Sequence, residues 1–154
     1  MQYLRKLKIQ LVRGEYKNPI KGQVREPKQI YEVFRAIKNK AHETLIGVYL
    51  NQNLEVNAYD TLSIGSSTET GVASDEIFDR VIITRSTYII LIHNHPSGKA
   101  TPSPADKHAM KVLSDDARVL RRVLLDFIIV GEKGYWSMFE RIDGGEYVLG
   151  RATL

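Results

Sequence analysis

The sequence contains no cysteine. Disulfide bonds, thiolate zinc sites and cysteine nucleophiles are therefore excluded, and histidine and the carboxylates remain as the only strong ligands for a transition metal. Histidine is scarce as well, with 4 among 154 residues. The search for a metal site is thus confined to four positions, which are His42, His93, His95 and His108.

Long apolar runs are also missing. No segment approaches the roughly 18 apolar residues of a membrane span, and the opening segment MQYLRKLKIQLVRGEY lacks the apolar core of a signal peptide. We therefore expect a cytoplasmic protein without a membrane partner. With 154 residues, 43% of them hydrophobic, the chain fits a single globular domain over residues 1–154.

Positive charge gathers in an N-terminal arm. Residues 1–28 contain eight lysines and arginines against two glutamates, a charge of +6, and the rest of the chain has 14 basic and 16 acidic side chains, a charge of −2. Such an arm could bind nucleic acid. Leu7, Ile9 and Leu11, however, alternate with Lys6 and Lys8, which predicts an edge strand whose solvated lysines discourage pairing with other chains. We favour this strand over a nucleic-acid site.

Beyond the arm, strand patterns alternate with helix patterns. Predicted helices begin at Pro27, at Ser74 and at Ser103, and predicted strands cover residues 45–50, 55–64, 89–92, 123–130 and 135–139. The inward positions of the first two helices are Ile30, Val33, Phe34, Ile37, Ile77, Phe78, Val81 and Ile82. This order predicts an α/β fold in which helices flank a mixed sheet.

The segment YIILIHNHPSGKATPSPADKHAM carries the clearest chemistry. His93 and His95 end an apolar strand, and side chains two apart on a strand point to the same face. Asp106 follows a loop rich in turn residues, so the chain can return a carboxylate to the two imidazoles. Two histidines and a carboxylate leave one position of a tetrahedral zinc open, which is the position that a hydrolytic zinc needs for water. The pattern predicts a zinc site at the end of a central strand.

A purely structural interpretation exists for each part of this pattern. The run from Ser103 to Asp106 is an acceptable helix start, and a single histidine in a strand is commonly a core residue. The joint spacing of the histidines, the serine and the aspartate favours a metal site, because the probability of a chance match to the whole pattern in a chain of this composition is on the order of a few in ten thousand. Both interpretations can hold together, since a helix start gives Asp106 a fixed position.

Hydrolysis also needs a base that takes a proton from water. Glu43 is a candidate because it lies at the junction between the first helix and the apolar strand at 45–50. An ordinary acid at the end of a helix would look the same, so the pattern leaves both roles open.

The motif HNHPSG followed by TPSPAD resembles the JAMM motif of the MPN (JAB) metalloprotease fold, and within it the RadC-type bacterial branch. The segments ETLIGVYLN, DEIFDRVI and LLDFIIVG resemble that branch too. The resemblance implies an MPN-like domain that holds zinc through His93, His95 and Asp106, with Glu43 as general base and Ser103 supporting the oxyanion. It implies zinc-dependent hydrolysis of a peptide or isopeptide bond in a protein or peptide substrate.

Two positions depart from the branch, which usually has Arg where Asp75 stands and His where Phe127 stands. We also expect this chain to lack the helix-hairpin-helix domain that often precedes the domain. That lack weakens any DNA binding inherited from the branch. Because RadC-type proteins carry a DNA-repair label, the alternative function is a DNA-repair-associated accessory protein with a structural or vestigial zinc site. His42 and His108 diverge in direction from the cluster and are expected to lie outside the ligand set. Asp126, in an apolar strand, requires a buried partner.

Overall fold

The computed structural model describes residues 3–64 and 74–143. The elements in chain order are α1 (Pro27–Phe34), the 3-10 helix η1 (Arg35–Asn39), β1 (Thr44–Leu50), β2 (Val56–Ile64), α2 (Ser74–Ile83), β3 (Tyr88–Asn94), α3 (Pro104–Val119), β4 (Val123–Gly131), β5 (Gly134–Ser137) and α4 (Met138–Asp143). The predicted alternation of helices and strands is confirmed.

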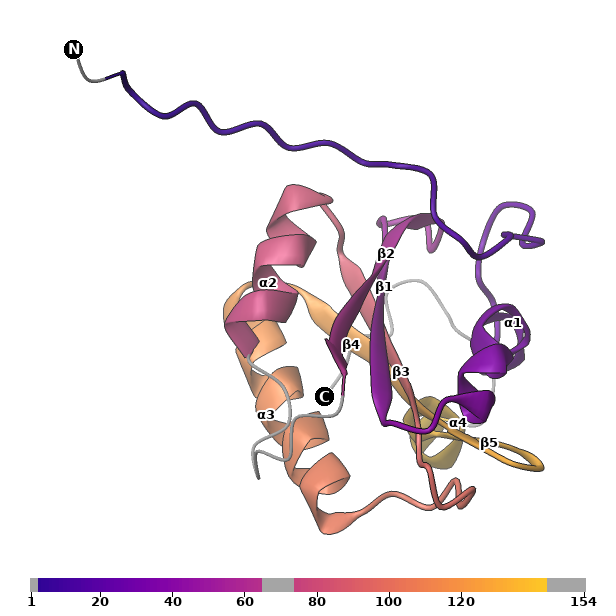
Figure 1. Ribbon diagram of the computed structural model, residues 1–154. Helices are drawn as coiled ribbons and strands as arrows, with labels where there is room; N and C mark the ends of the chain where they lie inside the picture. The colour runs from indigo at the N-terminus through magenta and orange to yellow at the C-terminus, as the bar shows by residue number, and fades with distance from the viewer. Residues whose placement is uncertain (1–2, 65–73, 144–154) are drawn as a thin grey trace.

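The strands form one mixed sheet in the order β2-β1-β3-β4-β5. Strand β1 is antiparallel to both β2 and β3, β4 is antiparallel to β5, and β3 and β4 are parallel. The parallel pair is joined through α3, as a parallel connection requires a crossover. Strands β1 and β3 are buried along their whole length because helices cover both faces of the sheet (Figure 1).

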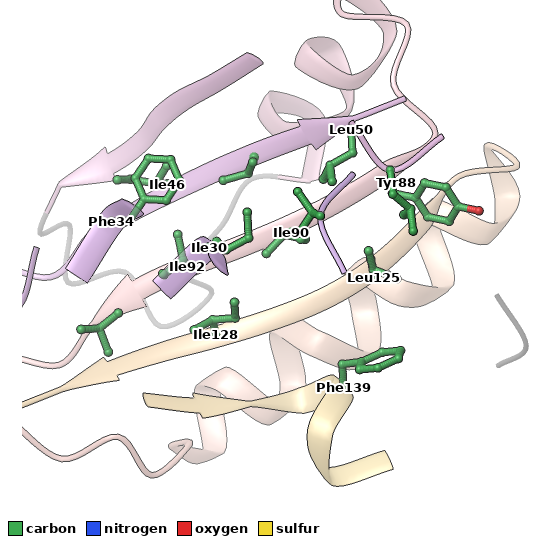
Figure 2. Packing of buried hydrophobic residues seen from close by; sticks show 14 of the residues in the cluster. Ile30, Phe34, Ile46, Leu50, Tyr88, Ile90, Ile92, Leu125, Ile128 and Phe139 are labelled. Carbon is green, nitrogen blue, oxygen red and sulfur yellow. The ribbon is translucent and has the colours of Figure 1, made fainter. Parts of the chain in front are cut away.

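One face of the sheet packs against α1, η1 and α4. Alternate residues of β1, β3 and β4 point to this face, among them Ile46, Ile90 and Ile128, and Ile30 and Phe34 of α1 cover them (Figure 2). A capping box between Glu26 and Gln29 and a proline at the first helical position begin α1.

The opposite face packs against α2 and α3. Its core includes Leu45 of β1, Leu91 of β3 and Phe127 of β4, and α2 and α3 contribute Phe78 and Leu113. Successive strand residues point to opposite faces of the sheet, and this alternation continues to the last residues of β3. His93 thus belongs to the α2/α3 face, and Asn94 to the α1/η1 face.

The predicted strand around Leu7, Ile9 and Leu11 is wrong. Residues 3–13 form neither helix nor strand, and these three side chains are 82%, 54% and 66% exposed. The described edges of the sheet are β2 and β5, and neither pairs with residues 3–13. Alternating apolar and basic residues favour an extended chain, but a strand also needs a neighbouring strand with which to pair.

The part of the arm that follows residues 3–13 is attached to the body at Tyr59 of β2. The Tyr59 hydroxyl accepts hydrogen bonds from the backbone N–H groups of Glu15 at 2.7 Å and Tyr16 at 3.3 Å. The ring of Tyr16 packs on Phe34 and Tyr59, with centroids 4.8 and 5.3 Å away. The ring of Tyr59 also lies against Gly14, where a Cβ atom would overlap it. The chain is therefore fixed from Gly14 to Tyr16.

Two predicted details are wrong. Ile82, predicted to face the core, is 61% exposed, and the residues that α2 buries are Ile77, Phe78 and Val81. The last predicted strand, 135–139, ends at Ser137, and Phe139 lies in α4.

The buried partners that Asp126 requires lie at this junction between β5 and α4. The Asp126 carboxylate accepts from the Ser137 hydroxyl at 2.7 Å and from the N–H groups of Phe127 at 2.7 Å and Phe139 at 3.0 Å.

Among the described residues, no helix has both the length and the apolar character that crossing a bilayer demands.

Candidate metal site

Four ligand-type side chains meet at one end of the central strands. They are Glu43, His93, His95 and Asp106, and each offers an atom within 4.8 Å of those of the other three. His93 lies near the end of β3, His95 follows β3, Asp106 lies in the first turn of α3, and Glu43 directly precedes β1. Antiparallel pairing of β1 with β3, with Leu45 opposite His93, brings Glu43 to the imidazoles.

The two imidazoles present their Nε2 atoms to Asp106. His93 Nε2 lies 3.3 Å from Asp106 Oδ1, and His95 Nε2 lies 3.1 Å from Asp106 Oδ2. The Nδ1 atom of His95 lies 2.8 Å from the carbonyl oxygen of Lys99. Because a carbonyl only accepts, that contact keeps a proton on Nδ1 of His95. Without a metal, Nε2 can carry a second proton and donate it to Asp106, and this hydrogen bond raises the pKa of His95. Loss of the Nε2 proton would make that nitrogen available to a metal.

His93 is the most enclosed member, at 2% exposure. Its Nε2 atom is buried and has no hydrogen-bond partner within the described part of the chain, because its contact with Asp106 lacks hydrogen-bond geometry. The Phe127 ring stands edge-on to the imidazole, with centroids 5.2 Å apart. An unpartnered buried nitrogen is costly unless a further group satisfies it.

Asp106 is held by the start of α3. Ser103 is the N-cap, and its backbone N–H and its hydroxyl donate to Asp106 Oδ2 at 2.7 and 2.8 Å. The Ser103 hydroxyl in turn accepts from the Asp106 N–H at 3.1 Å. Burial by itself raises the pKa of Asp106, but hydrogen bonds from His95 and Ser103 and the charge of His93 outweigh it and lower the pKa to about 2. Asp106 is thus an ionised carboxylate at neutral pH.

These atoms lie close enough together to bind one ion. Nitrogen and oxygen atoms bound to one zinc at about 2.0–2.1 Å are about 3.3 Å apart. His93 Nε2 and His95 Nε2 lie 3.3 and 3.1 Å from the Asp106 carboxylate, each from a different oxygen, and the ligand atoms of the cluster all lie within 4.8 Å of one another. The donor set also suits zinc, which prefers imidazole and carboxylate when thiolates are absent. The donor types of His93, His95 and Asp106 and their closeness therefore fit a metal ion such as zinc.

Glu43 occupies the solvent side of the cluster. Its side chain is 53% exposed, and its Oε1 atom lies 2.7 Å from His93 Nδ1. The hydrogen bond to His93 lowers the pKa of Glu43, an effect that burial partly opposes. Glu43 therefore touches the side of the His93 ring that faces away from Asp106.

All five residues singled out from the sequence, Glu43, His93, His95, Ser103 and Asp106, lie together, and their chemical roles stay predictions. His42 and His108 are exposed and outside the cluster, in keeping with their expected directions. The sequence reasoning missed Asn94, a buried residue whose side chain bonds to the segment that carries Glu43. A polar residue in a buried strand was the available signal.

The sequence is similar to a known family of proteins. The sequence profile described as a RadC-like JAB domain matches residues 24–144. A UPF0758 protein of Chlorobium phaeovibrioides is 29% identical over 129 residues, which are 83% of this chain and 58% of that protein. UPF0758 proteins of Streptococcus suis and Streptococcus gordonii are each 36% identical, over 73% and 70% of this chain and 46% and 47% of their own lengths. The chain spans about half the length of these curated relatives.

Proposed function

This chain belongs to the RadC-like JAB domain family, and from that membership we propose that it is a zinc-dependent hydrolase acting on a peptide or isopeptide bond. The observation that carries the proposal is the convergence of two imidazole Nε2 atoms on an ionised, buried carboxylate, with one of the two nitrogens lacking a hydrogen-bond partner among the described residues. Burial of the His93 nitrogen without a partner is unfavourable, and a bound cation would supply that partner.

His93, His95 and Asp106 would hold the ion. When bound, zinc supplies Lewis acidity, which polarises a carbonyl and makes water more acidic. The surrounding residues keep the three ligands in a binding geometry. The Lys99 carbonyl fixes the orientation of His95, Glu43 contacts the outer nitrogen of His93, and Ser103 holds the Asp106 carboxylate through two hydrogen bonds. Groups of this kind typically change metal affinity by about 10- to 100-fold.

Glu43 would move the proton. One of its carboxylate oxygens contacts His93, which leaves the other for a water molecule at the solvent side of the cluster. A lowered pKa keeps Glu43 ionised at neutral pH and thus able to accept a proton and pass it to a leaving amine.

Ser103 would stabilise developing negative charge on the substrate. Its hydroxyl donates to Asp106 at 2.8 Å, so turning that donor toward a substrate oxygen requires giving up this bond. The Ser103 backbone N–H would then still hold Asp106, at 2.7 Å. A hydroxyl directed at an oxyanion lowers the barrier of acyl transfer.

The basic arm supports a second function. Arg5, Lys6, Lys8 and Arg13 lie in an exposed segment, residues 3–13, that contains no acidic residue. Free lysines and arginines of this kind bind phosphates. A DNA-repair-associated accessory protein would use the arm to contact DNA and would keep zinc as a structural ion. The metal site itself favours hydrolysis, because a ligand set of His93, His95 and Asp106 is one ligand short of the four protein ligands typical of a structural zinc site.

The test combines metal analysis with hydrolysis. The purified full chain is expected to contain about one zinc and to cleave members of a panel of linear and isopeptide-linked peptides, with activity lost on chelation and restored by zinc. Glu43→Gln, purified in parallel, controls for contaminating proteases. Failure of the folded protein to bind zinc would overturn the proposal, and stoichiometric zinc without cleavage across the panel would favour the accessory function.

A further inference from the structure

Asn94 lies between the two candidate ligand histidines but points to the other face of the sheet. The residue is fully buried, with 0% exposure, on the face that packs against α1 and η1. Its side-chain oxygen accepts from the Thr44 N–H at 2.8 Å, and its side-chain nitrogen donates to the carbonyls of His42 at 3.3 Å and Lys40 at 3.4 Å. Its acceptor and donors are thus all directed at residues 40–44.

These bonds continue the pairing of β1 with β3 beyond its last residue pair. The ladder ends with Leu45 opposite His93. At the next position the Asn94 side chain, rather than a backbone carbonyl, takes the Thr44 N–H. The segment that leads into β1 is therefore attached to β3 by a side chain that alternates with the two imidazoles.

Two of the three bonded groups belong to the peptide units on either side of Glu43. The His42 carbonyl is part of the unit before Glu43, and the Thr44 N–H is part of the unit after it. Each peptide unit is planar, so the Glu43 backbone has only two free torsions, and fixing both units restrains both of them. The Glu43 side chain itself is 53% exposed, so packing contributes little to its position.

We propose that Asn94 is a positioning residue that holds Glu43 against His93. The catalytic use of Glu43 rests on the hydrolase function proposed above, whereas the positioning is a property of the protein with or without metal. An amide is the side chain that suits this place, because it combines an acceptor with two donors. Aspartate would keep the acceptor but would face the carbonyls of Lys40 and His42 with a charge and no donor.

The first test observes the contact between Glu43 and His93 directly. In protein labelled with ¹⁵N-histidine, the Nδ1–H of His93 should give a downfield imidazole signal protected from solvent exchange, and Glu43→Ala should abolish it. We expect Asn94→Asp and Asn94→Ala to accelerate this exchange by about 10-fold or more. A folded variant of either kind with wild-type protection would overturn the proposal, and amide spectra establish that the variant is folded.

Asn51 provides a matched control at the other end of β1. Its side-chain oxygen holds the turn before β2, accepting from the N–H groups of Asn53 at 2.8 Å and Glu55 at 3.0 Å. Asn51→Ala removes an asparagine clamp of the same kind and should leave the His93 signal unchanged. If Asn51→Ala changed that signal as much as the Asn94 variants do, the effect would be general loosening, and the proposal would fall.

A second test asks whether Asn94 acts through Glu43. Zinc affinity is measured by chelator competition for wild type, Asn94→Asp, Glu43→Ala and the double variant. We expect each single change to weaken zinc by about 10-fold, the usual scale for groups that orient a ligand, and the double variant to bind like Glu43→Ala alone. Multiplying effects would show that Asn94 acts on the histidines directly and would overturn the proposal.

The two tests separate this inference from the proposed function. A wild-type protein that binds no zinc removes the hydrolase function, while the exchange measurement on His93 still decides the role of Asn94. If the protein is a zinc-dependent hydrolase but the Asn94 variants change neither the His93 signal nor the zinc affinity, the positioning role of Asn94 is wrong and the hydrolase function stands.

Discussion

His93 Nδ1 and Glu43 Oε1 lie 2.7 Å apart, although the two residues are 50 positions apart in the sequence. The contact uses one oxygen of the carboxylate and one nitrogen of the ring. Pairing of β1 with β3 creates it, so neither residue reaches the other without the sheet. The same acid can therefore orient a ligand through one oxygen and exchange a proton through the other.

The first prediction separates these two uses of Glu43. Glu43→Gln keeps an acceptor oxygen for His93 and should retain the fold and most of the zinc. It loses the proton acceptor, so hydrolysis should fall by about 100-fold or more. Zinc content and turnover are measured on the same preparation. Unchanged turnover of any substrate that the wild type cleaves would remove Glu43 from the mechanism.

The second prediction concerns metal content. His95→Ala removes one of three ligands and should lose most of the zinc bound by the purified protein, as measured by elemental analysis. His108→Ala is the matched control, because His108 is exposed on α3 and lies outside the cluster. Full zinc occupancy in a well-folded His95→Ala protein would defeat the ligand assignment.

The third prediction concerns Ser103 as a helix cap. Ser103→Ala removes the acceptor for the Asp106 N–H and one donor to its carboxylate, and it should lower the free energy of unfolding by about 1 kcal/mol. Zinc affinity should fall less than in His95→Ala, because the Ser103 backbone N–H still holds Asp106. Ser97→Ala, in the same loop but exposed, serves as the control. Equal stability of the two variants in urea titrations would contradict the capping role.

The fourth prediction concerns the buried carboxylate of Asp126. Asp126→Ala leaves the Ser137 hydroxyl and the Phe139 N–H without this acceptor and should cost about 3 kcal/mol of unfolding free energy. Asp115→Ala removes exposed ion pairs with Lys111 and Arg118 and should cost far less than Asp126→Ala, because solvent screens such pairs. Chemical denaturation of both variants makes the comparison. A loss under 1 kcal/mol for Asp126→Ala would show that the network contributes little.

The fifth prediction concerns the arm. Since residues 3–13 form no strand, Lys6 and Lys8 protect no sheet edge, and Lys6→Ser with Lys8→Ser should leave the size of the protein in solution unchanged. We expect DNA binding weaker than micromolar at physiological salt, with a salt dependence that this variant flattens. A salt titration on labelled DNA measures both. Micromolar or tighter binding that the variant loses would make nucleic acid a partner.

The sequence predicted those parts of the structure that depend on short-range pattern. The helix start at Ser103 and Pro104 and the buried strand before His93 follow from local residue preferences, and both are confirmed. The gathering of His93, His95 and Asp106 follows from the same local unit of strand, loop and helix. Its members need no distant segment to meet.

Features that depend on tertiary contacts escaped prediction. The contact of Glu43 with His93 needs the order of the strands in the sheet, which periodicity does not provide. The role of Asn94 is not visible in the local pattern, because its partners are backbone groups about 50 positions away. The prediction of a strand in the arm was wrong because of a missing tertiary contact. The pattern of the arm is that of a strand, but a strand also requires an edge to pair with, and that requirement is not visible in the alternation of residues.

The hold of Tyr59 on residues 14–16 gives the arm a fixed origin. Extended at about 3.3 Å per residue, residues 3–13 reach about 36 Å from that point. Any molecule that the arm captures is thus tethered near the body, and short tethers of this kind produce effective concentrations in the millimolar range. A weak contact between the captured molecule and the body, unoccupied without the tether, would then become populated. The reach of residues 3–13 from Tyr59 determines which surfaces of the domain the captured molecule can contact.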